Sequence, residues 1–287
     1  MAVGGERRPS FTRVRTLLGW RLWSPADDAC VLEESGRIVG FVGLFPPDPQ
    51  GDYVPLLCIT HPDAEGDLVD AMLTWACVRA GALAQARGRM IGLHVTTSTA
   101  AGADSALLAH HGFDRLEAGL VTMARSLVDL PPSPILTHGF ALRSMPEPSE
   151  FANYRETYAP LFARRNPEAR RALMAHPDYD PALELLAVAE DGTLAAFCEC
   201  SRSRIEWQTT GRRVGEIDML LAHPGIRRRG LGRGLLLRSL HRLRDHGAQV
   251  ATLFTERANL PARALYEVLG FTITGEEAIF ARTFAPE

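Results

Sequence analysis

Two hydrophobic patterns follow each other in the C-terminal half of this 287-residue chain. A short apolar run, Ile217–Ala222, has the length of a buried strand, and it ends at His223-Pro224. After a glycine-rich stretch, leucines recur at helical spacing: Leu235, Leu236, Leu240 and Leu243. We therefore expect a strand, a glycine loop and a helix, in that order.

A second helix is expected over NLPARALYEVLGF, residues 259–271. Asn259 suits the N-cap, Pro261 suits the first turn, and Gly270 suits the C-terminal cap. The apolar segment 251–254 before this helix is predicted to be a strand, and another strand should begin at residues 271–274.

Similar landmarks occur in both halves of the chain. ESGRIVGFVGL near residue 34 resembles EDGTLAAFCEC near residue 190, each a glycine turn that leads into a strand. His61-Pro62 recurs as His223-Pro224, 162 residues later, and Gly112-Phe113 recurs as Gly270-Phe271, 158 residues later. The same order and the nearly constant offset predict a tandem duplication. Three prolines in 127–134 mark the join, so we expect domains at 1–130 and 136–287.

The loop Arg227-x-x-Gly230-x-Gly232 has the chemistry of an anion cradle. Glycines permit a tight turn with clustered N–H groups, and the following helix adds the positive end of its dipole. A P-loop is excluded because the chain has no lysine. A Rossmann fingerprint needs a third glycine where Leu235 stands. All 31 basic residues are arginine, a bias that can reflect a GC-rich genome. The run of three arginines at 227–229 is therefore weak evidence for a cluster selected to bind a ligand.

Two motifs carry a resemblance to the GNAT superfamily of N-acyltransferases. The loop matches its acyl-CoA motif, Gln/Arg-x-x-Gly-x-Gly/Ala, and residues 259–271 match its later motif, Asn-x-x-Ala-x-x-Leu-Tyr-x-x-x-Gly-Phe. The resemblance implies an α/β (α+β) fold: two tandem GNAT-like domains, each with a mixed, mainly antiparallel sheet flanked by helices. This tandem architecture is similar to that of mycothiol synthase.

The resemblance implies acetyl-CoA as co-substrate, held by the second domain and without a metal. The residues expected to bind it are Leu220, Leu221, Ala222, Arg227, Arg228, Arg229, Gly230, Leu231, Gly232, Arg233, Gly234, Asn259, Ala262 and Tyr266. In the first domain Glu65, Leu68 and Asp70 replace the loop arginine and the two glycines, so that copy is expected to bind no coenzyme.

Catalytic roles also follow from the resemblance. Glu216, eleven residues before Arg227, is the expected general base, and Tyr266 is the expected acid toward the departing sulfur. Asp218 should share a strand face with Glu216 by the period of two, so it is either the base itself or a neighbour that raises the pKa of Glu216. Backbone N–H groups near Leu221 are expected to polarise the thioester carbonyl.

Composition is consistent with a cytoplasmic enzyme. The formal charge of −3 argues against a general nucleic-acid binder, and no apolar run approaches a membrane span. Five cysteines without repeated spacing make no disulfide framework, and Cys198 and Cys200 are expected to be buried on one strand face. For the oligomeric state, both a monomer and a homodimer are compatible with the sequence.

The acceptor is expected to be the primary amine of a small molecule, which enters past helices over 148–175. Their side chains Tyr154, Tyr158, Phe162, Arg164 and Arg165 are wall candidates, although simple core packing is favoured for the aromatic ones. Trp207, in a predicted loop, is another. Two alternatives remain: a catalytically silent acyl-CoA-binding sensor, and a protein or peptide N-acetyltransferase.

Overall fold

The computed structural model describes residues 25–45, 52–61, 68–99, 102–132, 139–144, 174–175 and 177–286. The chain forms two compact units. The first unit combines Met1–Leu120 with Glu276–Glu287, and the second unit is Val121–Gly275.

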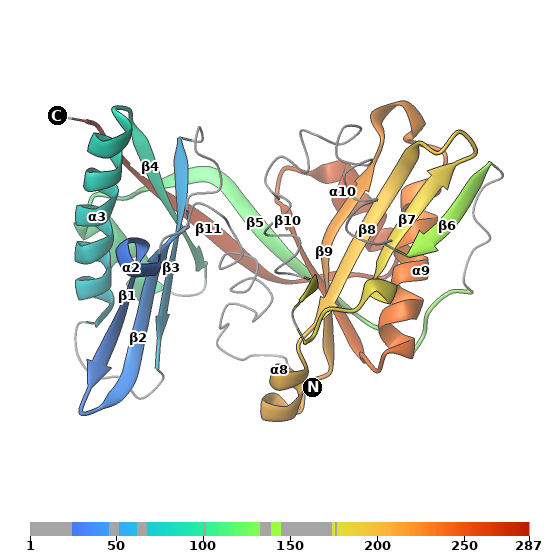
Figure 1. Cartoon of the computed structure of the whole chain (residues 1–287), viewed down its shortest axis with the longest axis horizontal. Helices are drawn as coiled ribbons and strands as arrows, with labels where there is room; N and C mark the ends of the chain where they lie inside the picture. Colours follow the sequence, from blue (N-terminus) through green and yellow to red (C-terminus); the bar gives the residue numbers. More distant parts are fainter. Residues whose placement is uncertain are drawn as a thin grey trace. The chain divides into compact units, whose positions relative to one another are not determined.

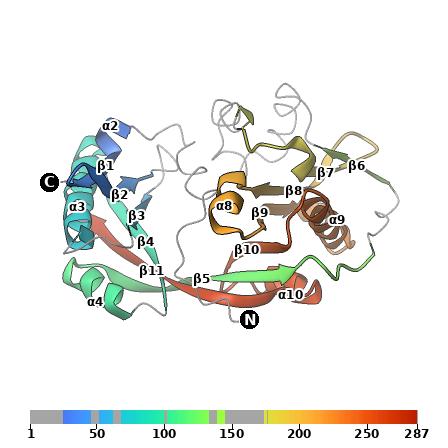
Figure 2. The ribbon, with the colours of Figure 1, turned by 90° about the horizontal axis from the view of Figure 1, so that it is seen from below.

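The first unit is a sheet with two helices packed on one face (Figures 1 and 2). Its strands lie in the order β1-β2-β3-β4-β11, and β3 and β4 are parallel while the other neighbours are antiparallel. The elements are α2 (Pro25–Asp28), β1 (Ala29–Glu34), β2 (Arg37–Leu44), β3 (Tyr53–Thr60), α3 (Leu68–Arg87), β4 (Ile91–Ser98), α4 (Gly102–His110), the start of β5 (Asp114–Ser126) and the end of β11 (Thr272–Phe284).

The second unit repeats this plan, with strand order β5-β10-β9-β8-β7-β6 (Figure 1). Strands β9 and β10 are parallel, and β6, β7, β8 and β9 pair antiparallel. The elements are β6 (Phe140–Ser144), η1 (Pro181–Leu183), β7 (Glu184–Ala189), β8 (Leu194–Arg202), α8 (Arg204–Thr210), β9 (Val214–Ala222), η2 (Pro224–Ile226), α9 (Leu231–Asp245), β10 (Val250–Glu256) and α10 (Leu260–Val268).

The leucine periodicity of the second half forms the core of this unit. The buried leucines Leu235, Leu236, Leu240 and Leu243 of α9 pack against β7, β8 and β9 in one apolar cluster, which also contains Tyr266. Leu127 and two residues of β5, Val121 and Met123, belong to the same cluster and are at most 1% exposed. The last strand of the first half is therefore part of the second unit's core.

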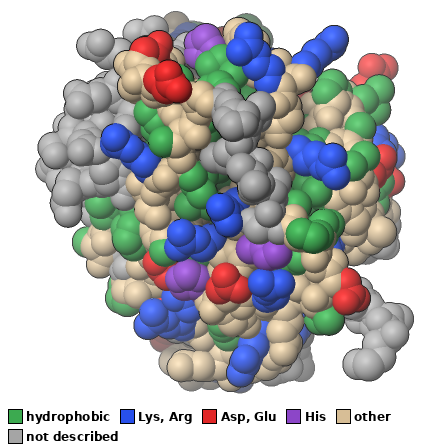
Figure 3. Space-filling view, turned by 90° about the vertical axis from the view of Figure 1, so that its right-hand side faces the viewer, with side chains coloured by type: hydrophobic (Ala, Val, Ile, Leu, Met, Phe, Trp, Pro, Cys, Tyr) green, Lys and Arg blue, Asp and Glu red, His purple; other side chains and the backbone are tan. Residues whose placement is uncertain are grey.

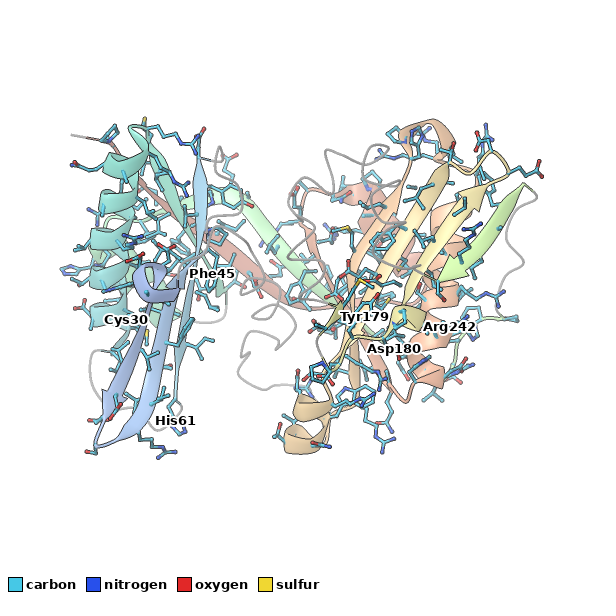
Figure 4. The ribbon with its side chains drawn as sticks, viewed as in Figure 1. Cys30, Phe45, His61, Tyr179, Asp180 and Arg242 are labelled. Atoms are coloured by element: carbon cyan, nitrogen blue, oxygen red, sulfur yellow. The ribbon has the colours of Figure 1, made fainter. Side chains whose placement is uncertain are left out.

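Before β7, the Asp180 carboxylate connects the start of the sheet to the end of α9 (Figure 4). It accepts a hydrogen bond from Ala182 N, at 3.1 Å, and it lies 3.1 Å from Arg202 Nη2 and 3.3 Å from His246 Nε2. The other nitrogen of His246 lies 2.8 Å from the carbonyl oxygen of Arg242. Both imidazole nitrogens of His246 thus face acceptor oxygens, one on Asp180 and one at the end of α9.

The tandem duplication is confirmed element by element. The first repeat, β1–β5, corresponds to the second repeat, β7–β11, through β1/β7, β2/β8, β3/β9, α3/α9, β4/β10, α4/α10 and β5/β11, whose first residues are 155 to 163 positions apart. Each repeat has a mixed, mainly antiparallel sheet with flanking helices, as expected.

The repeats exchange their last strands. Residues 277–284 of β11 pair antiparallel with β4 in the first unit, while β5 is the neighbour of β10 in the second. The unit boundary at residues 120/121 precedes the join expected in 127–134, and residues 276–287 group with the first unit. Compact units need not coincide with duplicated segments, so the domains at 1–130 and 136–287 stay a prediction.

Candidate active site

The central strand β9 separates from its parallel neighbour β10 halfway along its length. Cα pairing runs from Val214–Val250 to Ile217–Leu253, and both strands then continue, to Ala222 and Glu256. Residues 218–222 of β9 are only half-buried although the strand is central. Backbone N–H and C=O groups of β9 past Ile217 therefore lack β10 as a ladder partner, and such groups can bind a ligand that enters between the strands.

A β-bulge lies at the point of separation. The β8–β9 pairing passes from Glu199–Met219 to Cys200–Ile217 and skips Asp218. Ile217 packs with the α9 core, whereas Met219 and Leu221 pack with a different cluster on the opposite face. The expectation that Asp218 shares a face with Glu216 assumed an uninterrupted period of two, and this period is broken at Asp218 itself.

The glycine loop places an uncapped helix N-terminus at the end of β9. Gly230, with φ of +77°, is the N-cap of α9, and the cap has no side-chain hydrogen bond. Among the described residues no atom lies within 4 Å of a Cβ built at Gly230 or Gly232, so packing leaves space at both, while the positive φ of Gly230 favours glycine. The first N–H groups of a helix have no intrahelical partner, and together with the open space they fit a pyrophosphate.

The arginines of the loop are exposed at the same place. Arg227 Nε donates to the carbonyl oxygen of Ala222, 3.1 Å away, which ties the loop back to the end of β9. Arg228 has φ of +65°, an uncommon conformation for a residue with a side chain. Arg229 and Arg233 are also exposed. Every residue of the predicted coenzyme loop is thus within or next to the first turn of α9.

Tyr266 lies in α10 and is 8% exposed, within the core cluster that contains α9. Its ring meets Phe271 edge to face, with centroids 5.9 Å apart. Burial, and to a smaller extent the nearby Cys198, raise the pKa of the Tyr266 phenol to about 12. The phenol is therefore a hydrogen-bond donor at any physiological pH.

The expected caps of α10 are confirmed. Asn259 Oδ1 accepts from Ala262 N at 3.3 Å, Pro261 lies in the first turn, and Gly270, with φ of +83°, follows the last turn. Asn259 and Ala262 thus start the helix that carries Tyr266, and a role in binding coenzyme stays a prediction.

Glu216 has a polar neighbour that the sequence did not reveal. It is half-buried on the face of β9 opposite α9, and its Cα partner on β8 is Ser201, which is 7% exposed. Glu199, two residues earlier on the same face of β8, is opposite Glu184 of β7, and these two carboxylates are 5% and 1% exposed. Strand alternation in FCECSR is the signal in the sequence: it places Glu199 and Ser201 on the face opposite the two cysteines.

Cys198 and Cys200 are buried on the α9 face, as expected, with their sulfur atoms 3.9 Å apart. Among the described residues no group of three His, Cys, Asp or Glu side chains could hold a metal ion. On the face drawn in Figure 3, arginine side chains (blue) are interspersed with carboxylates (red). None of the described helices is long and apolar enough to cross a membrane.

The first repeat shares one feature of this site and lacks another. Strands β3 and β4 also pair only from Tyr53–Gly92 to Leu56–Val95, and both then continue, to Thr60 and Ser98. The β2–β3 register is regular, so β3 has no bulge where β9 has one. Asp70, at the position of the second loop glycine, forms an ion pair with His111 Nε2 at 2.8 Å. Leu68 is the first residue of α3, and Glu65 lies outside the described residues.

Of the side chains expected to line the acceptor site, the structure describes Trp207 alone. Residues Tyr154, Tyr158, Phe162, Arg164 and Arg165 lie outside the described residues. Trp207 lies in helix α8 and not in a loop; its Nε1 donates to the carbonyl oxygen of Val214, 2.7 Å away, at the start of β9. It lines a shallow hollow with Arg204, Gln208, Arg213, His246 and Gly247. This hollow is at the beginning of β9, whereas the glycine loop follows its end.

Known proteins resemble both the sequence and the fold. Residues 149–271 match the acetyltransferase (GNAT) family. The mycothiol acetyltransferase of Kineococcus radiotolerans is 32% identical over 261 residues, which cover 88% of this chain and 80% of that protein.

Two solved structures share the fold over nearly the whole chain. A GCN5-related N-acetyltransferase from Sphaerobacter thermophilus has a TM-score of 0.70 at 20% identity and covers 98% of this chain and 88% of its own. A tandem GNAT protein from the clavulanic acid biosynthesis pathway has a TM-score of 0.69 at 18% identity, covering 99% and 91%. This chain therefore belongs to the GNAT family and is an acyl-CoA-dependent acetyltransferase.

Proposed function

We propose that the protein transfers an acetyl group from acetyl-CoA to the primary amine of a small molecule, with Glu216 as general base and Tyr266 as general acid. The observation that carries the proposal is the separation of β9 from β10 at the Asp218 bulge, directly ahead of the uncapped α9 N-terminus. A long, thin ligand with a phosphate group at one end fits this combination.

The residues present fit the coenzyme by their chemistry. The first-turn N–H groups of α9, with Gly230 and Gly232 left open, suit the pyrophosphate. The edge of β9 at residues 218–222, which β10 does not pair, suits an amide-bearing chain, which can hydrogen-bond as a neighbouring strand does. Bound acetyl-CoA supplies the thioester. Leu220, Leu221 and Ala222 would supply backbone N–H donors to its carbonyl oxygen, and such donors stabilise developing negative charge.

Glu216 is the preferred base because it stands at the last paired positions of β9 before the strands separate. An amine that is protonated at neutral pH must lose a proton before it attacks a thioester. A carboxylate at the edge of the gap can accept that proton directly or through water. Asp218, at the bulge, is the alternative base, since a bulge redirects a side chain.

The acid role of Tyr266 is to donate a hydrogen bond to the departing sulfur, short of complete proton transfer. Its phenol has a pKa of about 12, whereas a thiol has an ordinary pKa of about 8.5. The two pKa values differ by roughly 3.5 units, so complete proton transfer from the phenol to the departing thiolate is unfavourable by about 5 kcal/mol. A hydrogen bond from a neutral phenol stabilises the thiolate without that cost, and bulk water then supplies the proton.

The acceptor face is the side of β7–β9 opposite α9, where Glu216 lies. Leu186, Phe197, Glu184 and Glu199 are buried beneath this face, and it is accessible at the half-buried Met219 and Glu216. Such a surface suits a polar amine with an apolar portion. The acceptor of the mycothiol acetyltransferase that this chain resembles is the first compound to test.

The test is thiol release from acetyl-CoA with a panel of amines: the acceptor of mycothiol acetyltransferase, polyamines, aminoglycosides and amino acids. We expect saturable release with at least one small amine and none with the Gly230→Asp variant. Release with peptide N-termini alone would replace the small-molecule acceptor by a protein. Binding of acetyl-CoA without release for any amine would identify a silent sensor.

A further inference from the structure

The last helix of each repeat ends in the same cap. In α10, Phe271 N donates to Tyr266 O at 3.0 Å and Gly270 N donates to Glu267 O at 2.9 Å. In α4, Phe113 N donates to Leu108 O at 3.0 Å, and Gly112 N to Ala109 O at 2.9 Å. This pair of bonds defines a Schellman motif, and it leaves the carbonyl of the cap residue, Leu269 or His111, without a helical partner.

An arginine from the other repeat binds that carbonyl in the second unit. Arg125 is near the end of β5, in the first repeat, and its Nη1 donates to Leu269 O. The same guanidinium donates from Nη2 to Asp129 O and from Nε to Ser126 O, both at 2.8 Å. Three donors in a planar fork fix the guanidinium and, with it, the end of α10.

The first unit contains the reciprocal contact. Arg282 is in β11, in the second repeat, and its Nη1 donates to His111 O at 2.6 Å. A Cβ on Gly112 would lie 3.6 Å from Arg282, and one on Gly270 would lie 3.5 Å from Arg125. The two arginines are 157 positions apart, against 158 for the two glycines. The strand exchange therefore carries a matched pair of arginine–carbonyl contacts.

Of the two arginine–carbonyl contacts, only that of Arg125 is made at the helix that carries Tyr266. The Schellman bond of α10 uses the carbonyl of Tyr266 itself, three residues before Leu269. The equivalent residue in α4 is Leu108, which has no polar side chain. A cation at the negative end of a helix is favourable, and Arg125 is partly buried, so its contact is shielded from water.

We propose that Arg125, supplied by the first repeat, is a positioning residue that fixes the C-terminal turn of α10 and thereby aims the Tyr266 hydroxyl at the reacting sulfur. The proposal rests on the proposed function of Tyr266. It gives the first repeat a part in turnover even though that repeat has no coenzyme loop of its own.

The experiment is a double-mutant cycle on the full chain, with Arg125→Gln, Tyr266→Phe and both together, and with Arg282→Gln as the matched control. We expect Arg125→Gln to lower kcat by roughly tenfold or more, since small displacements of a catalytic group are costly, while KM for acetyl-CoA stays within about twofold. In the Tyr266→Phe background, Arg125→Gln should have no further effect on kcat. Arg125→Lys, which keeps the charge, should recover part of the loss.

The control separates positioning from stability. Arg282→Gln should speed hydrogen exchange at the Phe113 amide and leave kcat within about twofold, whereas Arg125→Gln should speed exchange at Phe271 and also lower kcat. If Arg125→Gln does not fold, the cycle is run with Arg125→Lys.

Four results would overturn the proposal. Effects of Arg125→Gln and Tyr266→Phe that multiply would show that Arg125 acts through another group. An equal loss of kcat in Arg282→Gln would show a general loss of packing. Full activity of Arg125→Gln beside a slow Tyr266→Phe would remove the positioning role and leave the proposed function intact, whereas a fully active Tyr266→Phe would remove both.

Discussion

Leu108 and Tyr266 occupy the same position in two copies of one helix cap. The carbonyl oxygen of each accepts the N–H of a phenylalanine five residues later, at 3.0 Å in both. The two helices α4 and α10 are therefore superposable in their hydrogen bonding and differ in chemistry, because only the second has a phenol. The first repeat has the helix and cap of the second without its tyrosine.

Tyr266→Phe should lower kcat by about 10²-fold, because it removes the hydrogen bond to the departing thiolate and leaves the packing of the ring almost unchanged. The affinity for acetyl-CoA should stay within about threefold, since the hydroxyl interacts mainly in the transition state. Steady-state kinetics and calorimetric titration with CoA measure the two effects. Tyr53→Phe, in β3 of the first unit, is the matched control and should behave as wild type.

Gly230→Asp should abolish coenzyme binding, because it places a carboxylate where the α9 N-terminus should meet the pyrophosphate. Gly211→Asp is a matched control: φ is +69° at Gly211 and +77° at Gly230, and the space beside both is open. Calorimetry should show one CoA per chain for wild type and for Gly211→Asp, and none for Gly230→Asp. Two CoA molecules per chain would mean that the first repeat also binds coenzyme.

Glu216→Gln should lower kcat by ~10²–10⁴-fold with little change in CoA affinity, as expected for a general base. Asp218→Asn tests the alternative at the bulge. A fully active Glu216→Gln together with an inactive Asp218→Asn would assign the base to Asp218. Full activity in both would mean that water or the acceptor itself supplies the base.

The pKa of Tyr266 predicts a distinct alkaline titration. Its pKa is raised from 10.0 to about 12, so folding favours the neutral phenol. The corresponding stability, of the order of 3 kcal/mol, is fully present below pH 10 and is lost as the pH rises through about 12. Near-ultraviolet absorbance should show one tyrosine that titrates near 12 in wild type and is missing in Tyr266→Phe. Loss of a phenol that titrates near 10 would contradict the prediction.

Residues 136–287 alone should not fold stably. That fragment lacks Val121, Met123 and Leu127, which are at most 1% exposed in the core of the second unit. Removing large buried side chains costs roughly 2–5 kcal/mol each, which together rivals the total stability of a domain. A longer fragment, 114–287, should be more soluble and melt at a higher temperature. Equal melting of 136–287 and the intact chain would refute this.

Local signals predicted most of the second half of the chain. Gly230 and Asn259 set the beginnings of α9 and α10, and their conformations follow from residue type within a few positions. Helix α8 could have been found in the same way, because Ser203 and Glu206 have the spacing of a capping box, and Ser203 Oγ does accept from Glu206 N. We missed that signal.

The bulge and the strand exchange could not be read from the sequence. A bulge at Asp218 changes which side chains face the core, but an aspartate in an apolar strand looks the same with or without one. The exchange of β5 and β11 is hidden for another reason. Both strands are repeats of one element, and each supplies an equivalent arginine to a helix cap, so local sequence does not distinguish the exchanged from the unexchanged pairing.

The pairing of β4 with β11 also determines when the first unit can complete its sheet during translation. Ile91 of β4 pairs with Phe284 of β11. The first unit therefore lacks the strand that covers β4 until 193 further residues have been translated. At about 5–20 residues per second, this takes roughly 10–40 s. During that interval the unpaired edge of β4 is open to aggregation, and a chaperone that shields nascent strands should matter more for this chain than its size suggests.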